Sequence, residues 1–189
     1  MGVYDIVNMF NELVDEDPYK ADALYYISLC WGCEGARLSY VIKYGDDVKY
    51  SQVVRELNRR KIMNIISDVC SIINRIVRNN SKFLEFFERD TIERFKRLSK
   101  KALKLFKVLS KLGIYESLIE SDIGSILYTS MIVNSVLRSM FKVFYELKCC
   151  IIELVRAGLL VLCCIAPYEG LPHMYRVPIY SLKIWKMFS

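Results

Sequence analysis

Apolar residues recur at intervals of three and four along most of this chain, and that spacing is typical of helices that bury one face. The longest example, residues 49–78, predicts one long helix that ends near Asn79, Asn80 and Ser81. Its apolar side is formed by Val53, Val54, Leu57, Ile62, Ile65, Ile66, Val69, Ile72, Ile73 and Ile76. The sequence therefore favours a mainly helical fold.

Two further helical patterns precede this segment. Residues 3–14 predict a short amphipathic helix that ends at Asp15–Pro18. Residues 19–44 continue the helical spacing, punctuated by Gly32 and Gly35, before a loop at residues 45–47.

Residues 90–112 form the clearest amphipathic pattern. Asp90 and Glu93 have the spacing of a capping box, so a helix is predicted to begin there and to run to Leu112, before Gly113. One side of this helix is apolar and the other is cationic. The cationic side has no interleaved acid: between Arg94 and Lys111 there are eight bases and no Asp or Glu.

The basicity of the chain is local. Residues 51–112 hold sixteen bases and six acids, a net +10 within a chain whose total is +6. Such a surface suggests binding to phosphate, in nucleic acid or lipid headgroups, or to an acidic partner. Nucleic acid is favoured because the apolar face of the basic helix is needed for the core and cannot also insert into lipid.

One bias in the composition points to a source. There is one His, one Gln and two Thr against 27 Lys plus Arg, a bias typical of hyperthermophiles. AT-rich coding or viral codon usage gives part of the same bias. We expect a hyperthermophilic archaeon or a virus that infects one.

The last third changes character. Residues 118–128 predict a short helix, and residues 130–157 predict one long helix or two. Two short apolar runs, residues 159–165 and 173–179, then suggest a β-hairpin in which Pro178 confines its strand to an edge. Strand alternation would turn one of Cys163 and Cys164 to the core and the other to solvent. Residues 180–188 predict an apolar, aromatic helix or tail.

The segment from Glu153 to Leu162, ELVRAGLLVL, resembles the end of a winged helix-turn-helix domain, where the recognition helix closes in a phrase of the kind L-x-x-A-G-L-L before the wing. The resemblance covers about residues 94–180, with helices at 103–112, 120–128 and 134–157. It implies base readout by Arg138, Lys142 and Lys148 and wing contacts by Tyr168, His173 and Arg176. Here the third helix is apolar nearly all round, which favours burial or dimerisation.

No enzyme signature is present. His173 is the one imidazole, and no nucleophile elbow or phosphate-binding glycine loop occurs. The pair Cys30 and Cys33 lacks the further ligands that a zinc site needs, so no metal and no cofactor are predicted. A redox dithiol at this pair is the alternative, although such a motif normally lies at a strand-to-helix junction of a βαβ unit, which the sequence does not show. The seven cysteines are expected to be buried as small hydrophobes or to form disulfides, and the pairs Cys30/Cys33, Cys149/Cys150 and Cys163/Cys164 stay open.

Localisation follows from two absences in the sequence. The first twenty residues lack the pattern of a secretory leader, and the most apolar stretch, residues 157–166, is too short to span a bilayer. A cytoplasmic protein, or a virion component if viral, is expected.

Together these patterns predict a mainly α helical bundle with a possible C-terminal hairpin, divided into residues 1–93 and 94–189 within one compact unit. The predicted function is non-enzymatic binding of duplex DNA, mostly through phosphates, by a homodimer or larger homo-oligomer assembled through residues 130–157. The alternatives are a self-assembling virion or nucleocapsid protein and a helix-bundle interaction module. The predicted contact residues are Arg94, Lys96, Arg97, Lys100, Lys101, Lys104, Lys107, Lys111, Arg138, Lys142, Lys148, Tyr168, His173 and Arg176.

Overall fold

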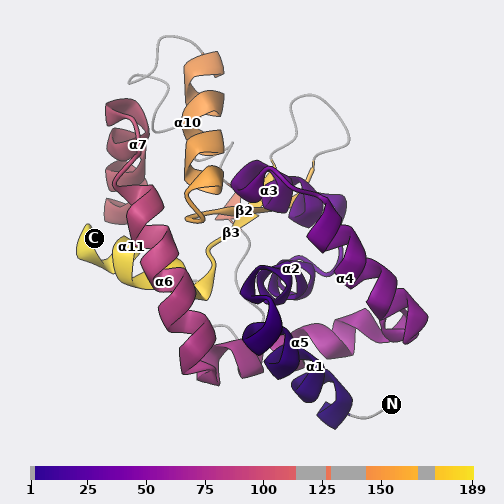
Figure 1. Cartoon of the computed structure of the whole chain (residues 1–189). Helices are drawn as coiled ribbons and strands as arrows, with labels where there is room; N and C mark the ends of the chain where they lie inside the picture. The colour runs from indigo at the N-terminus through magenta and orange to yellow at the C-terminus, as the bar shows by residue number, and fades with distance from the viewer. Residues whose placement is uncertain (1–2, 114–126, 129–143, 166–172) are drawn as a thin grey trace.

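A computed structural model describes residues 3–113, 127–128, 144–165 and 173–189, and their fold is mainly helical, as predicted (Figure 1). The first part contains α1 (Val3–Glu16), α2 (Pro18–Leu29), α3 (Glu34–Tyr44), α4 (Val48–Arg59), the 3-10 turn η1 (Ile62–Ile65), α5 (Ile66–Asn79), α6 (Ser81–Phe95) and α7 (Lys100–Lys111). The second part contains β1 (Leu127–Tyr128), α10 (Phe144–Arg156), β2 (Val161–Cys164), β3 (Met174–Arg176), the 3-10 turn η2 (Ile179–Ser181) and α11 (Leu182–Met187).

Helix α2 lies at the centre of the first hydrophobic core. Asp17 caps it by accepting a hydrogen bond from the Tyr19 N–H, and Pro18 occupies its first turn. Every residue from Ala21 to Leu29 is buried, because α2 packs against α1, α3, α4 and α5. A helix enclosed on all sides has no polar face, and α2 indeed shows almost no amphipathic pattern.

The second core lies between α7, α10, α11 and the sheet. Helices α7 and α10 lie side by side (Figure 1). Trp185 of α11 is fully buried here, with its ring 4.5 Å from that of Phe106 between centroids, and its indole Nε1 donates to the carbonyl of Leu159 at 3.2 Å. Leu182, Ile184, Trp185 and Phe188 all pack in this core, so the end of the chain is folded against it rather than forming a tail.

The C-terminal hairpin is confirmed: β2 and β3 pair antiparallel. The edge position predicted for the second strand is wrong, since β3 lies between β1 and β2. Pro178 does not interrupt the ladder because it lies beyond the strand, as the residue that precedes η2. Leu127 and Tyr128 belong to β1, so the helix predicted over residues 118–128 is wrong at its last two positions; the others lie outside the described residues.

The long helix predicted over residues 49–78 is interrupted. Its end near Asn79 is confirmed, but α4 stops at Arg59 and α5 starts at Ile66. Lys61 adopts a left-handed backbone conformation, with φ 58°. The break allows Leu57 and Ile62 both to be buried, whereas five residues along one straight helix would place them about 140° apart.

The helix predicted from Asp90 to Leu112 is also two helices. Asp90 lies inside α6, whose N-cap is Asn80, and its carboxylate pairs with Arg94 instead of capping (2.9 Å). The second helix starts at Ser99, whose Oγ accepts a hydrogen bond from the Ala102 N–H. Arg94 therefore lies on α6, while the lysines that follow lie on α7.

The two cores share segments from both predicted regions. Val161, Cys163 and Tyr180 pack into the first core with α1 to α6, and Ile42 of α3 packs against the second. Contacts therefore cross the expected boundary at residues 93 and 94.

Candidate nucleic-acid interface

Four lysines form a row on the outer face of α7. At 100° per residue, Lys100, Lys104, Lys107 and Lys111 fall within an arc of about 60° and span about 16 Å of the helix axis. All four are exposed. We call these four residues the lysine stripe.

The opposite face of α7 fixes the direction of the stripe. Ala102, Leu105, Phe106 and Leu109 are fully buried in the second core. Because one side of the helix is held inside the protein, the lysines are presented to solvent as a row rather than scattered around a mobile helix.

The stripe carries no compensating acid. None of its four lysines forms an ion pair with a carboxylate of the described residues. The two acids of α10 that face α7 are used elsewhere: Glu146 pairs with Lys101 (2.9 Å), and Glu153 accepts hydrogen bonds from the N–H and Oγ of Ser99. Within the part of the chain that the structure describes, the stripe has no carboxylate partner, and its one ring contact places Lys107 Nζ 5.7 Å from the centroid of Phe188.

Three of the predicted contact residues have partners in the protein. Arg94 is partly buried, pairs with Asp90 and donates to the carbonyls of Lys43 and Arg156. Lys96 pairs with Glu93 at 2.6 Å. Lys101 pairs with Glu146, which raises its pKa. Arg94 thus ties α6 to α3 and α10.

The contact residues implied by the winged-helix resemblance do not share one exposed surface among the described residues. Arg176 is 5% exposed and its guanidinium donates to the carbonyl of Leu29, so it lies inside the protein rather than on a wing surface. Burial lowers its pKa. His173 is partly buried and Lys148 is exposed on α10, as Arg97 is between α6 and α7. Arg138, Lys142 and Tyr168 lie outside the described residues.

The subunit interface predicted for residues 130–157 is occupied, over α10, by the chain itself. Leu147, Cys150, Ile151 and Leu154 are buried against the second core. Packing within the chain therefore explains the apolar character of this helix without a second copy.

A buried ion pair was not predicted. Lys43 Nζ lies 3.1 Å from Asp22 Oδ2, and both side chains are fully buried. The same carboxylate oxygen accepts a hydrogen bond from the Tyr44 hydroxyl at 2.5 Å, and Lys43 also donates to the Tyr180 hydroxyl. Desolvation lowers the pKa of Lys43. The ammonium lies among four rings, those of Tyr26, Tyr44, Phe87 and Tyr180.

One disulfide joins two cysteines that are far apart in the sequence. Cys30 and Cys163 form a disulfide, while Cys33, Cys70, Cys149, Cys150 and Cys164 are free thiols. None of the three neighbouring pairs considered from the sequence is the one that forms. The predicted alternation is confirmed, because Cys163 is buried and Cys164 is exposed.

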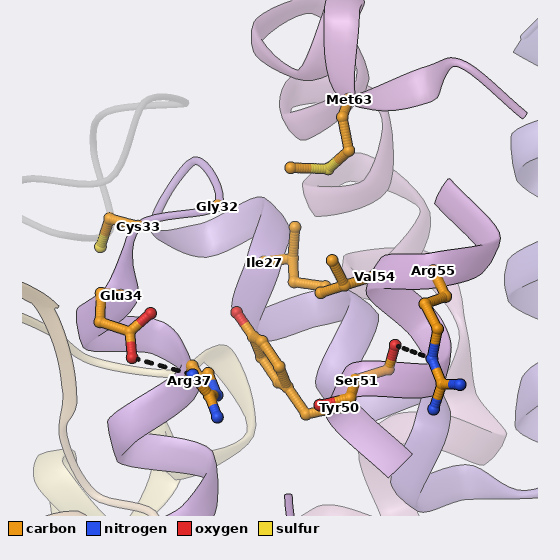
Figure 2. A pocket seen from close by; sticks show the side chains of 10 residues that line it. All are labelled: Ile27, Gly32, Cys33, Glu34, Arg37, Tyr50, Ser51, Val54, Arg55 and Met63. Carbon is orange, nitrogen blue, oxygen red and sulfur yellow. Dashed lines mark hydrogen bonds and ion pairs between the residues drawn. The ribbon is translucent and has the colours of Figure 1, made fainter. Parts of the chain in front are cut away.

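A cavity of about 510 Å³ opens between α3 and α4 (Figure 2). Ile27, Val54 and Met63 supply its apolar wall, and Cys33 and Arg37 lie on the other side.

Among the described residues, no group of three or more side chains is arranged to hold a metal ion. Within the same residues, no helix combines the length and apolarity needed to cross a bilayer.

Comparison with known proteins gives no relative: no family model, curated protein or solved structure matches the chain.

Proposed function

We propose that this protein binds nucleic acid through contacts between the lysine stripe of α7 and backbone phosphates. The observation that carries the proposal is the exposed row of four lysines, without a carboxylate partner among the described residues. Duplex DNA presents about one negative charge per 1.7 Å of its axis, so a stripe of about 16 Å faces several phosphates at once. Arg97, just before α7, and Lys148, in α10, are further exposed cations.

The binding is proposed to be largely independent of sequence. Contacts to phosphates position a protein on the duplex without reading its sequence, and a lysine ammonium is a point charge without the planar fork of Arg. The stripe contains lysine only. Base readout by Arg138, Lys142 and Lys148, implied by the winged-helix resemblance, stays a prediction, as does assembly into a homo-oligomer.

A membrane surface is the less favoured partner. Peripheral helices that bind lipid insert an apolar face beside their cationic one. In α7 that apolar face is occupied by the second core, with Leu105 and Phe106 fully buried. The stripe can therefore offer charge to a partner but no hydrophobic anchor.

Replacing Lys100, Lys104, Lys107 and Lys111 together by Gln is expected to weaken duplex binding and to reduce the slope of log K against log salt by about three to four. Gln is a comparable helix former, and the four side chains are exposed, so the fold should be retained. The measurement is a titration of random-sequence duplex at several salt concentrations, followed by fluorescence anisotropy.

A control removes the same charge elsewhere. Arg55, Lys61, Arg75 and Arg89 are exposed and lie outside α7. Replacing these four by Gln should leave the salt slope close to that of the unmodified protein. Equal salt slopes for the unmodified protein and the stripe variant would reject the assignment. If the control variant lost as much affinity and salt slope as the stripe variant, the net charge of the protein would explain the binding instead of the stripe. Light scattering of the same samples reports whether large assemblies form, as expected of a coat protein.

A further inference from the structure

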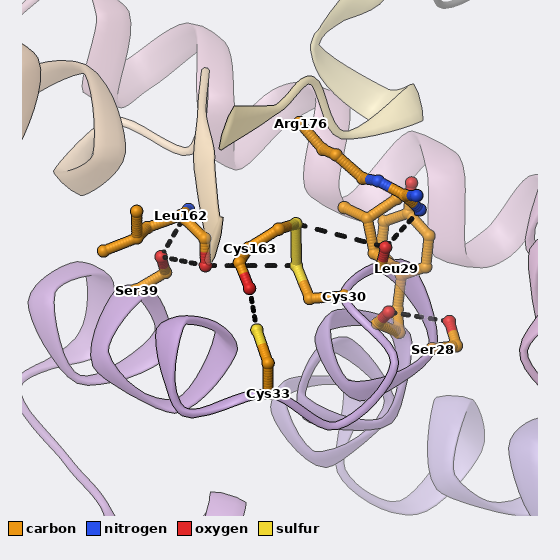
Figure 3. Close-up of a disulfide and its surroundings, with 9 residues drawn as sticks. Ser28, Leu29, Cys30, Cys33, Ser39, Leu162, Cys163 and Arg176 are labelled. Atoms are coloured by element: carbon orange, nitrogen blue, oxygen red, sulfur yellow. Dashed lines mark hydrogen bonds between the residues drawn. A yellow bond between two sulfur atoms is a disulfide. The ribbon is translucent and has the colours of Figure 1, made fainter. Parts of the chain in front are cut away.

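Three cysteines meet where the turn between α2 and α3 contacts β2 (Figure 3). Cys30 ends α2 and forms the disulfide with Cys163 of β2. The Cys33 N–H donates to the Cys30 carbonyl at 3.2 Å, and the Cys33 thiol donates to the Cys163 carbonyl. Cys33 is thus a free thiol in contact with both residues of a disulfide.

The backbone holds this arrangement in place. Trp31 and Gly32 both adopt positive φ, 54° and 72°, which turns the chain back so that Cys33 faces β2. A bulky residue with positive φ is uncommon and persists only where its surroundings fix it. Gly35, in the first turn of α3, touches β2 so closely that a Cβ there would lie 2.5 Å from the Leu162 carbonyl oxygen. Cys163 itself lies at an irregularity in the pairing of β2 with β3.

The disulfide and the thiol differ in access. Cys30 is 7% exposed and Cys163 4%, so a reagent in solution has little contact with either sulfur. Cys33 is partly exposed and lines the cavity of about 510 Å³ (Figure 2). This volume accepts a small molecule, and a thiol in the cavity would meet Cys33 before it met the disulfide.

Opposing effects set the reactivity of Cys33. The backbone N–H groups of Gly35 and Ala36 stabilise its thiolate and lower its pKa, but burial raises the pKa by more, so the net shift is upward. We therefore expect exchange at Cys33 to be slow at neutral pH and to accelerate as the pH rises toward that pKa, because the thiolate is the attacking form.

We propose that Cys33, Cys30 and Cys163 form a thiol–disulfide exchange site through which a low-molecular-weight thiol reduces the buried disulfide. In the first step the Cys33 thiolate attacks Cys30 Sγ, the Cys30–Cys163 bond breaks, and the Cys163 sulfur takes the electron pair and then a proton. The product is a Cys30–Cys33 disulfide at the cavity. No external oxidant or reductant is consumed in this step.

The external thiol acts in the second step. Its thiolate attacks the Cys33 sulfur, which releases Cys30 and leaves a mixed disulfide on Cys33. A second thiol then attacks the small-molecule sulfur of that mixed disulfide, so that Cys33 leaves as a thiol. Two external thiols are oxidised to one disulfide, and one protein disulfide is reduced to two thiols. The site is independent of the lysine stripe.

Cys33→Ser tests the relay. The folded protein is treated with 2-mercaptoethanol, quenched with acid, alkylated and mapped by mass spectrometry for the Cys163 thiol. We expect the rate of its appearance to fall at least about tenfold in Cys33→Ser, because the only route left is direct attack on a buried disulfide. Cys149→Ser, in α10, is the matched control and should keep the unmodified rate, whereas Cys164→Ser tests the neighbouring thiol that interacts with Cys33.

Two further measurements distinguish exchange through the Cys33 thiol from a change in how easily a reductant reaches the disulfide. A phosphine reductant attacks disulfides without exchange through a protein thiol, so it should reduce the unmodified protein and Cys33→Ser at equal rates. In Cys163→Ser, mild oxidation should join Cys30 to Cys33. The proposal is overturned if 2-mercaptoethanol reduces Cys33→Ser at an unchanged or faster rate, or if the phosphine also reduces this variant more slowly. It is overturned as well if Cys164→Ser, and not Cys33→Ser, is reduced more slowly by 2-mercaptoethanol, or if oxidised Cys163→Ser contains no Cys30–Cys33 disulfide.

Discussion

Raising the pH from 9 to 11 is expected to unfold this protein, because seven of its thirteen tyrosines are held in their neutral form by the fold. Burial raises the pKa of Tyr175 to about 12, and it raises the pKa of the other six further. Those six are Tyr25, Tyr26, Tyr40, Tyr44, Tyr50 and Tyr180.

The sign follows from proton binding. Above the ordinary tyrosine pKa of about 10, the unfolded chain loses protons that the folded chain keeps, so the free energy of unfolding falls as the pH rises. Each tyrosine costs about 1.4 kcal/mol by pH 11, and seven together cost an amount comparable with the whole stability of a typical domain, about 5–15 kcal/mol. Lys43 acts in the opposite direction below pH 10.5, since its pKa is lowered in the fold, but it is one group against seven.

The measurement is a pH titration that follows tyrosinate absorbance and circular dichroism together. The part of the absorbance change that comes from these seven tyrosines should coincide with the circular dichroism change in one cooperative step. Tyr175→Phe should make the loss of stability shallower by about 1 kcal/mol between pH 10 and 11. Tyr4, which is 82% exposed, is the control, and Tyr4→Phe should change nothing. Gradual ionisation of all tyrosines near pH 10 with the fold intact would contradict this expectation.

Replacing Lys43 by Met is expected to destabilise the fold by about 3–5 kcal/mol, because the Asp22 carboxylate is left charged and buried. Met has a similar length and is apolar, so the loss reports the missing charge more than a cavity. The Tyr44 hydroxyl, 2.5 Å from Asp22, cannot replace an ammonium. Denaturant unfolding at neutral pH gives the free energy of unfolding.

Two further variants identify the cause of that loss. Asp22→Asn combined with Lys43→Met removes both charges, and it should cost clearly less than the two single losses added together. Lys82→Met breaks an exposed pair with Asp15 and should be neutral within error. Additive losses in the double variant would show that the pair itself is not the source of the stability.

Local signals in the sequence predicted the elements that local chemistry determines. The amphipathic spacing of residues 3–14 gave α1, and Asp17 with Pro18 gave the boundary that follows it. The two apolar runs around residues 166–172 gave the hairpin. In these segments the backbone follows from side chains a few residues apart, so a single sequence suffices.

The sequence-based predictions were wrong where a contact between residues far apart in the sequence determines the structure. Ser99 rather than Asp90 caps the basic helix, because Glu153 on α10 accepts the Ser99 N–H and hydroxyl. Arg176 was expected in solvent, but Leu29, 147 residues earlier, supplies the carbonyl that holds it inside. Nothing near Cys30 in the sequence indicates that its partner is Cys163. The exposed, cationic side of α7 was predicted from the sequence, because helical spacing alone places these lysines on one face of the helix.

The contact between α3 and β2 has a consequence for synthesis. Ser39 accepts a hydrogen bond from the Leu162 N–H at 2.7 Å, and Tyr180 packs beneath α2. At about 5–20 residues per second, the ribosome needs roughly 6–23 s after Tyr44 to reach Val161. Throughout that interval α3 lacks its contact with β2, although α1, α4 and α5, the other helices around α2, have been synthesised by residue 79. The growing polypeptide therefore leaves the face of α3 that β2 covers exposed until residues 161–164 have been synthesised.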